Sequence, residues 1–283
     1  MSIRKVLGVL AAAAMAVSLC GCGEGASEYD ASSIGPKLNI GITFDRPGLG
    51  FSHSSEYKGL EVDLARLIAQ DLGYSPNQIV WKQVRPGSRE GALTSGQVDM
   101  VLASYSITQA RKQVVDFAGP YFMAGQDLLV RKDEGSIKGV DSLEDRRVCT
   151  EKGSTSSQVI RRRAPKALLQ ERDELGQCIT ALLSGDADAA SSDDFVLAGL
   201  AHVKGGGQLR LVGVPFTRER YGVGVRKDQA ELVSTINHAL EKMMKDGGWA
   251  AAVKEAASSI GYQVDPSSRR PDRLDGSLSS EVR

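Results

Sequence analysis

One short polar turn carries three hydroxyl side chains and a guanidinium, on Ser104, Ser106, Thr108 and Arg111. The apolar run at 98–103 is typical of a buried strand, and Thr108 is a residue type that caps helix N-termini. We therefore expect the turn to leave the carboxyl end of a strand and enter a helix, where free backbone N–H groups favour an anion. Because the planar fork of arginine matches a carboxylate, the turn predicts a carboxylate seat with Arg111 as its cation.

An internal repeat predicts a second polar turn in an equivalent place. Residues 92–99 (ALTSGQVD) match residues 181–188 (ALLSGDAD), and each copy reads as a helix end, a glycine stop and a strand that carries an aspartate. The polar turns that follow are 104–108 and 191–194. Ligands of open α/β sheets bind beyond the carboxyl ends of strands, so two such units facing each other would form a cleft.

The remaining hydrophobic pattern predicts an α/β chain of two lobes. Residues 36–129 together with 219–262 would form the first lobe, and residues 130–218 the second. The strand at 126–131 would carry the chain into the second lobe, and the strand at 221–226 would return it. The segment 263–283 is dominated by Ser, Arg, Asp and Pro, so we expect a disordered tail.

The amino terminus predicts a lipid anchor. Arg4 and Lys5 precede about 14 apolar residues, fewer than the roughly 20 that span a membrane, and the stretch ends in Leu-Cys-Gly-Cys. We expect 1–21 to be a lipoprotein signal peptide and Cys22 to be lipidated, with Cys20 or a retained membrane helix as alternatives. Residues 22–35 would tether the domain to the extracytoplasmic face of the cell membrane.

Charge and cysteine content narrow the class of protein. The 35 basic residues balance 35 acidic ones, which gives no electrostatic argument for nucleic acid binding. After the signal peptide, Cys149 and Cys178 are the cysteines that remain besides Cys22, and outside the cytoplasm such a pair predicts a disulfide, or else two buried thiols. Neither cysteine has a second ligand at zinc spacing. We expect no metal, no cofactor and a monomer.

The turn 104–111, with the Val-Asp-Phe-Ala-Gly-Pro-Tyr-Phe stretch at 115–122, resembles the family 3 extracellular solute-binding proteins, which are the amino-acid receptors of ABC importers. The stretches 44–50, 148–150 and 153–155, and Asp193 with 197–199, look like the actinobacterial glutamate and glutamine branch. The resemblance implies a periplasmic-binding-protein-like (type II) fold, a ligand clamped between the lobes, and permease subunits as partners.

The resemblance also assigns ligand contacts. Arg111 would pair with the α-carboxylate of an amino acid, and Ser106 and the N–H of Thr155 would add hydrogen bonds. The main-chain carbonyl of Ser104 would accept from the α-ammonium, for which Asp193 would be the counter-ion. Physical chemistry supports these roles, because a buried zwitterion needs both charges answered. The alternatives are a solvated Arg111 and an Asp193 that only caps a helix.

Selectivity for the ligand side chain is expected from the loops of the first lobe. Arg46 is the residue that we expect to contact a side-chain carboxylate, which makes glutamate the first candidate ligand, ahead of glutamine, aspartate and asparagine. Phe44 would pack on the aliphatic stem of the ligand or in the core. The chain departs from the branch at Arg46, where Gln is frequent, and at Gly59–Asp63, where the branch has Gly-Phe-Asp-Val-Asp.

Two other functions use the same fold. A sensor module would report an amino acid to a membrane kinase with unchanged binding chemistry. A dehydratase-like enzyme would need a general acid or base in the cleft, whereas His53, His202 and His238 are scattered along the chain. The sequence therefore favours a receptor that is not an enzyme.

Overall fold

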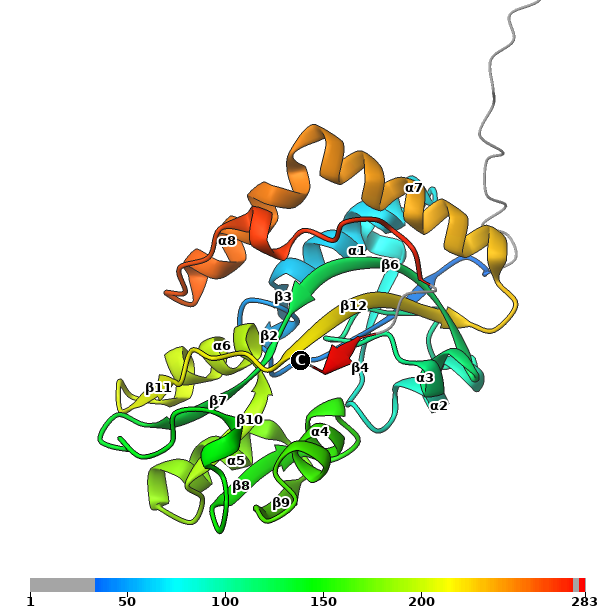
Figure 1. The fold of residues 1–283 in the computed structure, drawn as a ribbon. Coiled ribbons are helices and arrows are strands. Elements are labelled where there is room, and N and C mark those ends of the chain that lie inside the picture. The colour runs from blue at the N-terminus through cyan, green and yellow to red at the C-terminus, as the bar shows by residue number, and fades with distance from the viewer. Residues whose placement is uncertain (1–33, 277–279, 283) are drawn as a thin grey trace, which may run out of the picture.

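Two β-sheets flanked by helices form the protein in the computed structural model, which describes residues 34–276 and 280–282 (Figure 1). This is the two-lobed α/β architecture that the sequence predicts. The predicted signal peptide, its lipidated Cys22 and most of the predicted tether lie outside the described residues. No helix in the described part of the chain has both the length and the apolar character that a membrane crossing requires.

The first sheet has the strand order β13-β12-β5-β1-β4, with β6 also paired to β12. Its strands are β1 (Leu38–Ile42), β4 (Ile79–Gln83), β5 (Met100–Val101), β6 (Val115–Ala124), β12 (Thr217–Arg226) and β13 (Glu281–Val282). β1 runs parallel to β4 and β5, while β12 runs antiparallel to β5 and β6. A small hairpin of β2 (Phe51–His53) and β3 (Glu56–Lys58) lies apart from this sheet. The carboxyl ends of β1, β4 and β5 therefore meet at one edge.

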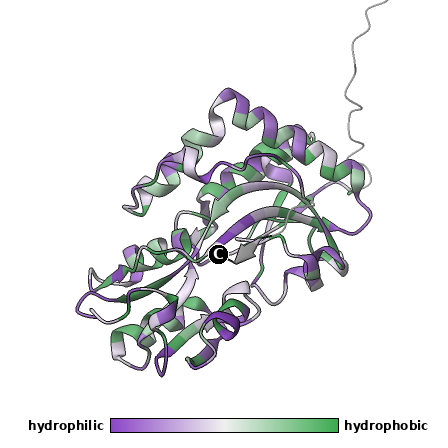
Figure 2. Cartoon of the chain, in the orientation of Figure 1, coloured by the Kyte–Doolittle hydropathy of each residue, from purple (hydrophilic) through white to green (hydrophobic). Residues whose placement is uncertain are grey.

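The helices of the first lobe are α1 (Leu60–Asp71), η2 (Pro76–Gln78), α2 (Arg89–Thr94), α3 (Gln109–Lys112), α7 (Ala230–Asp246), α8 (Gly248–Ser259) and η4 (Pro266–Arg269). The three longest, α1, α7 and α8, each bury an apolar face. In α7 the buried residues Leu232, Ile236, Ala239, Leu240 and Met243 recur at helical spacing. Figure 2 shows the resulting mixture of apolar and polar residues along α7 and α8. The core between these helices and the sheet holds the site loops in place.

The second sheet has the order β11-β7-β10-β8-β9. Its strands are β7 (Gln126–Arg131), β8 (Arg147–Glu151), β9 (Leu168–Arg172), β10 (Ala189–Asp193) and β11 (Leu209–Leu211). Its helices are η3 (Val140–Ser142), α4 (Thr155–Arg163), α5 (Leu175–Ser184) and α6 (Asp194–Lys204). Cys149 on β8 and Cys178 on α5 form a disulfide with Cα atoms 5.4 Å apart, so the predicted bridge fastens α5 to the strand that leads into the cleft.

Two adjacent connections join the lobes. β6 continues into β7 through Gly125, and β11 leads back into β12 through residues 212–216. The connections are bonded to each other, because the amide of Gln126 donates to Oγ1 of Thr217 and the carbonyl of Gln126 accepts from Phe216. A Cβ at Gly125 would lie 2.8 Å from Cβ of Pro215. Glycine is therefore needed at position 125, where the two connecting segments lie against each other.

The described residues of the carboxy-terminal segment, 263–276 and 280–282, contain two regular elements, unlike the disordered tail that composition predicts for 263–283. After α8 the chain forms η4, runs beside β6, and adds β13 to β12 through Thr217 and Arg218 (Figure 1). The guanidinium of Arg269 lies 2.5 Å from a carboxylate oxygen of Asp194 in the second lobe. This polar segment is held in place by a buried ion pair and by strand pairing. Neither contact can be inferred from the composition of the segment, because both partners lie elsewhere in the chain.

Candidate functional site

A small cavity lies between the two lobes and gathers most of the predicted site. Its lining comes from both lobes: Thr43, Arg46, Pro86, Arg89, Ala103, Ser104 and Arg111 from the first, and Glu151, Ser154, Thr155, Ser156, Ser192, Asp193 and Val196 from the second. Five predicted residues, Arg46, Ser104, Arg111, Thr155 and Asp193, therefore meet here. The cavity leaves about 30 Å³ for water, room for roughly two molecules, so the lobes are closely apposed.

Arg111 reaches the cavity from the start of α3. The Thr108 side chain caps this helix by accepting from the amide of Arg111 at 3.2 Å, as its residue type predicts. The guanidinium donates to the carbonyl of Ser106 at 2.7 Å and lies 3.2 Å from a carboxylate oxygen of Glu90. It also lies 5.0 Å from the ring centre of Tyr105. These contacts hold the cation at the cleft.

The N-terminus of α4 faces Arg111 from the second lobe. Ser154 caps the helix by accepting from the amide of Ser157, and Thr155 and Ser156 in the first turn line the cavity. Amides at these first helical positions have no partner within the helix. Arg111 donates a 3.5 Å hydrogen bond to the carbonyl of Gly153 just before the helix. A cation and free amides thus converge on one side of the cavity, where an anion is favoured.

Asp193 provides the opposite charge at the end of β10. Its carboxylate is buried, and Oδ2 accepts a 2.5 Å hydrogen bond from the hydroxyl of Tyr221. Oδ1 is buried without a hydrogen-bond partner among the described residues. Burial, and after it the neighbouring Glu219, raise the pKa of Asp193 well above its ordinary value. A ligand ammonium would satisfy Oδ1 and favour the ionised carboxylate.

Ser104 has a strained backbone beside this carboxylate. Its φ of 48° lies in the left-handed region that residues other than glycine seldom adopt. Its amide donates to Glu61 at 2.5 Å, its carbonyl accepts from Arg89 at 3.2 Å, and its hydroxyl is buried with no hydrogen-bond partner in the described part of the chain. Strain of this kind clusters at binding sites. The carbonyl predicted to meet a ligand ammonium is thus already bonded to Arg89.

Arg89 is a second buried cation at the cavity. It donates to the carbonyl of Ala103 at 2.8 Å, and its guanidinium lies 4.3 Å from the ring centre of Tyr105. Burial, and then the nearby charge of Arg111, lower the pKa of Arg89 to about 10, which leaves it charged at neutral pH. Nothing in the local sequence distinguishes Arg89 from the exposed Arg85, so the sequence alone does not single it out.

Arg46 is buried and already paired. Its guanidinium forms an ion pair with Glu151 of the second lobe and lies 2.8 Å from a carboxylate oxygen of Asp45. Glu151 is not among the residues predicted from the sequence, although it is the last residue of β8 and lies just before the turn at 153–155. Burial raises the pKa of Glu151, and Arg46 opposes that shift.

Two predicted residues lie outside the lining of this cavity. Ser106 is buried, pairs its backbone with Tyr221, and gives its carbonyl to Arg111. Phe44 packs on Tyr57, with ring centres 5.3 Å apart, beside the main core. Phe44 is therefore packed beside the core, and its contact with the aliphatic stem of a ligand stays a prediction.

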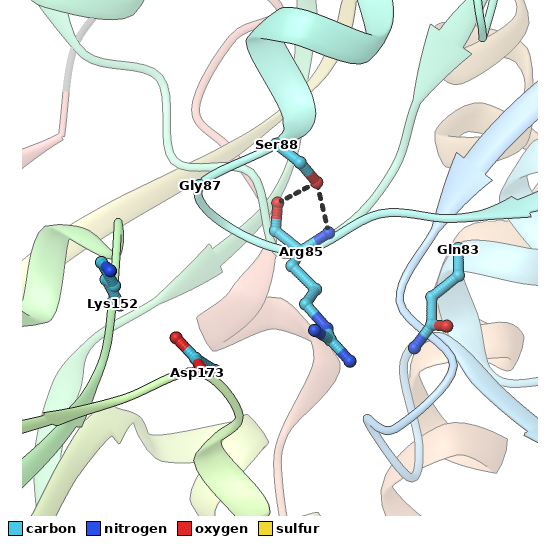
Figure 3. A pocket seen from close by; sticks show the side chains of 6 residues that line it. All are labelled: Gln83, Arg85, Gly87, Ser88, Lys152 and Asp173. Atoms are coloured by element: carbon cyan, nitrogen blue, oxygen red, sulfur yellow. Dashed lines mark hydrogen bonds between the residues drawn. The ribbon is translucent and has the colours of Figure 1, made fainter.

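A wider pocket of about 510 Å³ opens at the outer edge of the cleft, lined by Gln83, Arg85, Gly87, Ser88, Lys152 and Asp173. Figure 3 shows Arg85 and Gln83 across from Lys152 and Asp173, with the Ser88 hydroxyl bonded to the backbone of Arg85. Beside it, Arg85 pairs with Glu174 of the other lobe at the surface. Residues 34–276 and 280–282 contain no group of three His, Cys, Asp or Glu placed to hold a metal ion.

The chain is similar to known amino-acid-binding proteins. Residues 38–257 match the sequence profile of the bacterial extracellular solute-binding proteins, family 3. The chain is 36% identical to the glutamate-binding protein GluB of Corynebacterium efficiens over 88% of this chain and 90% of the relative. It is 39% identical to the glutamine-binding protein GlnH of Bacillus subtilis over 75% and 77%. The solved structure of an ancestral arginine-binding protein bound to arginine matches with a TM-score of 0.73 and 34% identity, over 78% of this chain and 97% of that one.

Proposed function

Because this chain belongs to the bacterial extracellular solute-binding proteins of family 3, we propose that it binds one free polar amino acid between its lobes and delivers it to the permease of an ABC importer. The relatives named for glutamate and glutamine support a ligand of that class. The observation that carries the proposal is the unpartnered Oδ1 of Asp193 in the same cavity as Arg111 and the first turn of α4.

Separate groups in the site would neutralise the two charges of a zwitterion. Arg111 and the amides of Thr155 and Ser156 would hold the α-carboxylate, and Asp193 the α-ammonium. Ser106 would assist through the carbonyl that positions Arg111. Since the cavity has room for only about two waters, the ligand enters when the lobes separate and is enclosed when they close.

Removing either charge tests the clamp. Arg111→Ala and Asp193→Ala should each weaken binding of every amino-acid ligand by about two to four decades, because the opposite ligand charge is then buried unpaired, a cost of about 3 to 5 kcal/mol. Calorimetry with glutamate, glutamine, aspartate and asparagine measures this. The matched control is Arg161→Ala, which removes an exposed paired arginine of α4. Near-native affinity in either cavity variant would refute the clamp.

We propose further that Cys22 carries a lipid that holds the receptor at the outer face of the cell membrane. Leu19 and Gly21 before Cys22 support this assignment. Cys22→Ala should appear in the medium, or remain as unprocessed precursor, while the domain still binds its ligand. A variant that partitions into membranes like the wild type would contradict the anchor.

A receptor without catalysis fits these residues better than an enzyme. The relatives at 36% and 39% identity are named as binding proteins. None of the described residues that line the cavity is a histidine, and Arg46, Glu151 and Arg111 are engaged in ion pairs. Unchanged recovery of each amino acid after prolonged incubation with the protein would agree with this assignment.

A further inference from the structure

An ion pair between the lobes lies inside the ligand cavity. Arg46 follows β1 in the first lobe, and Glu151 ends β8 in the second. Their side chains are 4% and 5% exposed, and both line the cavity that also contains Arg111 and Asp193. Unlike the exposed pair Arg85–Glu174, which also joins the lobes, this pair is therefore placed to meet a bound ligand.

The carboxylates in direct contact with Arg46 carry more charge than its guanidinium. Arg46 supplies one positive charge, and Glu151 and Asp45 supply two negative ones within contact distance of it. The Arg46 guanidinium is thus more than neutralised before any ligand binds. A ligand carboxylate placed against Arg46 would lie beside Glu151, and two carboxylates in a buried site raise each other's free energy.

The hydrogen-bonding character of the pair points to a different side chain. Arg46 offers only donors, and an ionised Glu151 offers only acceptors. A carboxamide has both, since its oxygen can accept from Arg46 while its NH₂ group donates to Glu151. A carboxylate can only accept, and an ammonium or guanidinium can only donate and would face Arg46.

We propose that the Arg46–Glu151 pair sets the side-chain specificity of the receptor and selects a carboxamide, with glutamine bound more tightly than glutamate. This inference rests on the proposed function. It also reverses the role expected for Arg46, which was to bind a side-chain carboxylate. The residue that cancels the charge of Arg46 is Glu151, which belongs to the other lobe and is far away in the sequence.

Charge removal at constant size tests the pair. Calorimetry gives the ratio of dissociation constants, glutamate over glutamine, for the wild type and for Glu151→Gln. We expect a ratio above ten in the wild type, because glutamate brings a third carboxylate to the pair. In Glu151→Gln the ratio should fall at least tenfold, because Arg46 then becomes available to the ligand carboxylate.

Two further variants keep the test decisive. Asp45→Asn removes the partly exposed carboxylate and should lower the ratio in the same direction by a smaller factor, even if Glu151→Gln folds poorly. Glu174→Gln is the matched control, since it removes the same charge from a surface pair between the lobes, and its ratio should stay within twofold of the wild type.

Each other outcome has a distinct meaning. A wild-type preference for glutamate, or a ratio in Glu151→Gln and Asp45→Asn no different from that in Glu174→Gln, would overturn the specificity assignment while the receptor function stands. A wild type that binds arginine or lysine more tightly than glutamine would overturn it as well. Binding of no amino acid at all would overturn the proposed function, and this inference with it.

Discussion

The hydroxyl of Tyr221 donates a 2.5 Å hydrogen bond to Oδ2 of Asp193, and the two residues come from different sheets. Tyr221 belongs to β12, which returns the chain to the first sheet, while Asp193 ends β10 in the second. The bond leaves Oδ1 without a partner in the described structure. Tyr221 is therefore a positioning residue for the carboxylate that we assign to the ligand ammonium.

Tyr221→Phe should weaken every amino-acid ligand by about tenfold, or about 1.4 kcal/mol, because a charge-assisted hydrogen bond to Asp193 is lost while the ring remains. Calorimetry with several amino acids measures the effect. Tyr74→Phe is the control, since it removes a tyrosine hydroxyl bonded to the carbonyl of Gly35 away from the cavity. Equal affinities in the two variants would argue against the positioning role.

Ligand binding should release protons from Asp193. Burial raises the pKa of Asp193 well above its ordinary value, and Glu219 and Asp194 act in the same direction while Arg89 opposes them. A ligand ammonium favours the ionised form and lowers that pKa. Affinity should therefore fall as the pH drops through the raised pKa of the ligand-free protein.

Calorimetry in two buffers of different ionisation enthalpy measures this release, and identical apparent enthalpies would contradict it. Stability should respond with the opposite sign. A carboxyl group whose folded pKa is raised stabilises the ligand-free fold at low pH, and this contribution is lost as the pH rises through the folded pKa. Burial raises the pKa of Glu61 and Glu151 as well, so both add to the effect.

Local patterns in the sequence predict elements well where periodicity and turn residues agree. The strand at 126–131 appears as β7 with the expected bounds. The long strand β6 was harder to predict because it contains Gly119 and Pro120, two residue types that disfavour strands. It is stabilised by pairing with β12, about a hundred residues later in the chain.

The residues of the site also differ in how far the sequence predicts them. The two polar turns, together with the family resemblance, predict that Arg111, Thr155 and Asp193 meet in one cavity, because strand ends and helix starts are local features. The partners of charged side chains are not local. Glu151 lies 105 positions from Arg46, and Asp194 lies 75 from Arg269, so no single stretch of sequence contains either pair.

Loss of the disulfide should destabilise the second lobe. Cys149 and Cys178 are 29 positions apart, and the loop-entropy relation gives about 3 to 4 kcal/mol for such a loop. The double variant Cys149→Ala/Cys178→Ala should lower the free energy of unfolding by about that amount in urea titrations. Addition of a reductant should affect the wild type and leave the double variant unchanged. Two free thiols in protein made under oxidising conditions would contradict the bridge.

The carboxy-terminal segment should contribute to stability through one buried contact. Arg269, whose side chain is 15% exposed, pairs with the buried Asp194, and Asp194 also accepts from the amide of Gly125 at the connection between the lobes. Arg269→Ala leaves that carboxylate buried without its cation, which should cost about 3 to 5 kcal/mol in urea unfolding. The Arg269–Asp194 ion pair therefore attaches the carboxy-terminal segment to the connection between the lobes.

A matched pair of variants separates this contact from mere attachment of the segment. Arg218 pairs with Asp272 of the same segment, but this pair is largely exposed, so Arg218→Ala should change the unfolding free energy little. Truncation before residue 265 should reproduce most of the loss seen in Arg269→Ala. The buried ion pair is the contact of the segment that is most sensitive to loss of a partner. If Arg269→Ala and Arg218→Ala had equal unfolding free energies, the segment would therefore lie on the domain without stabilising it.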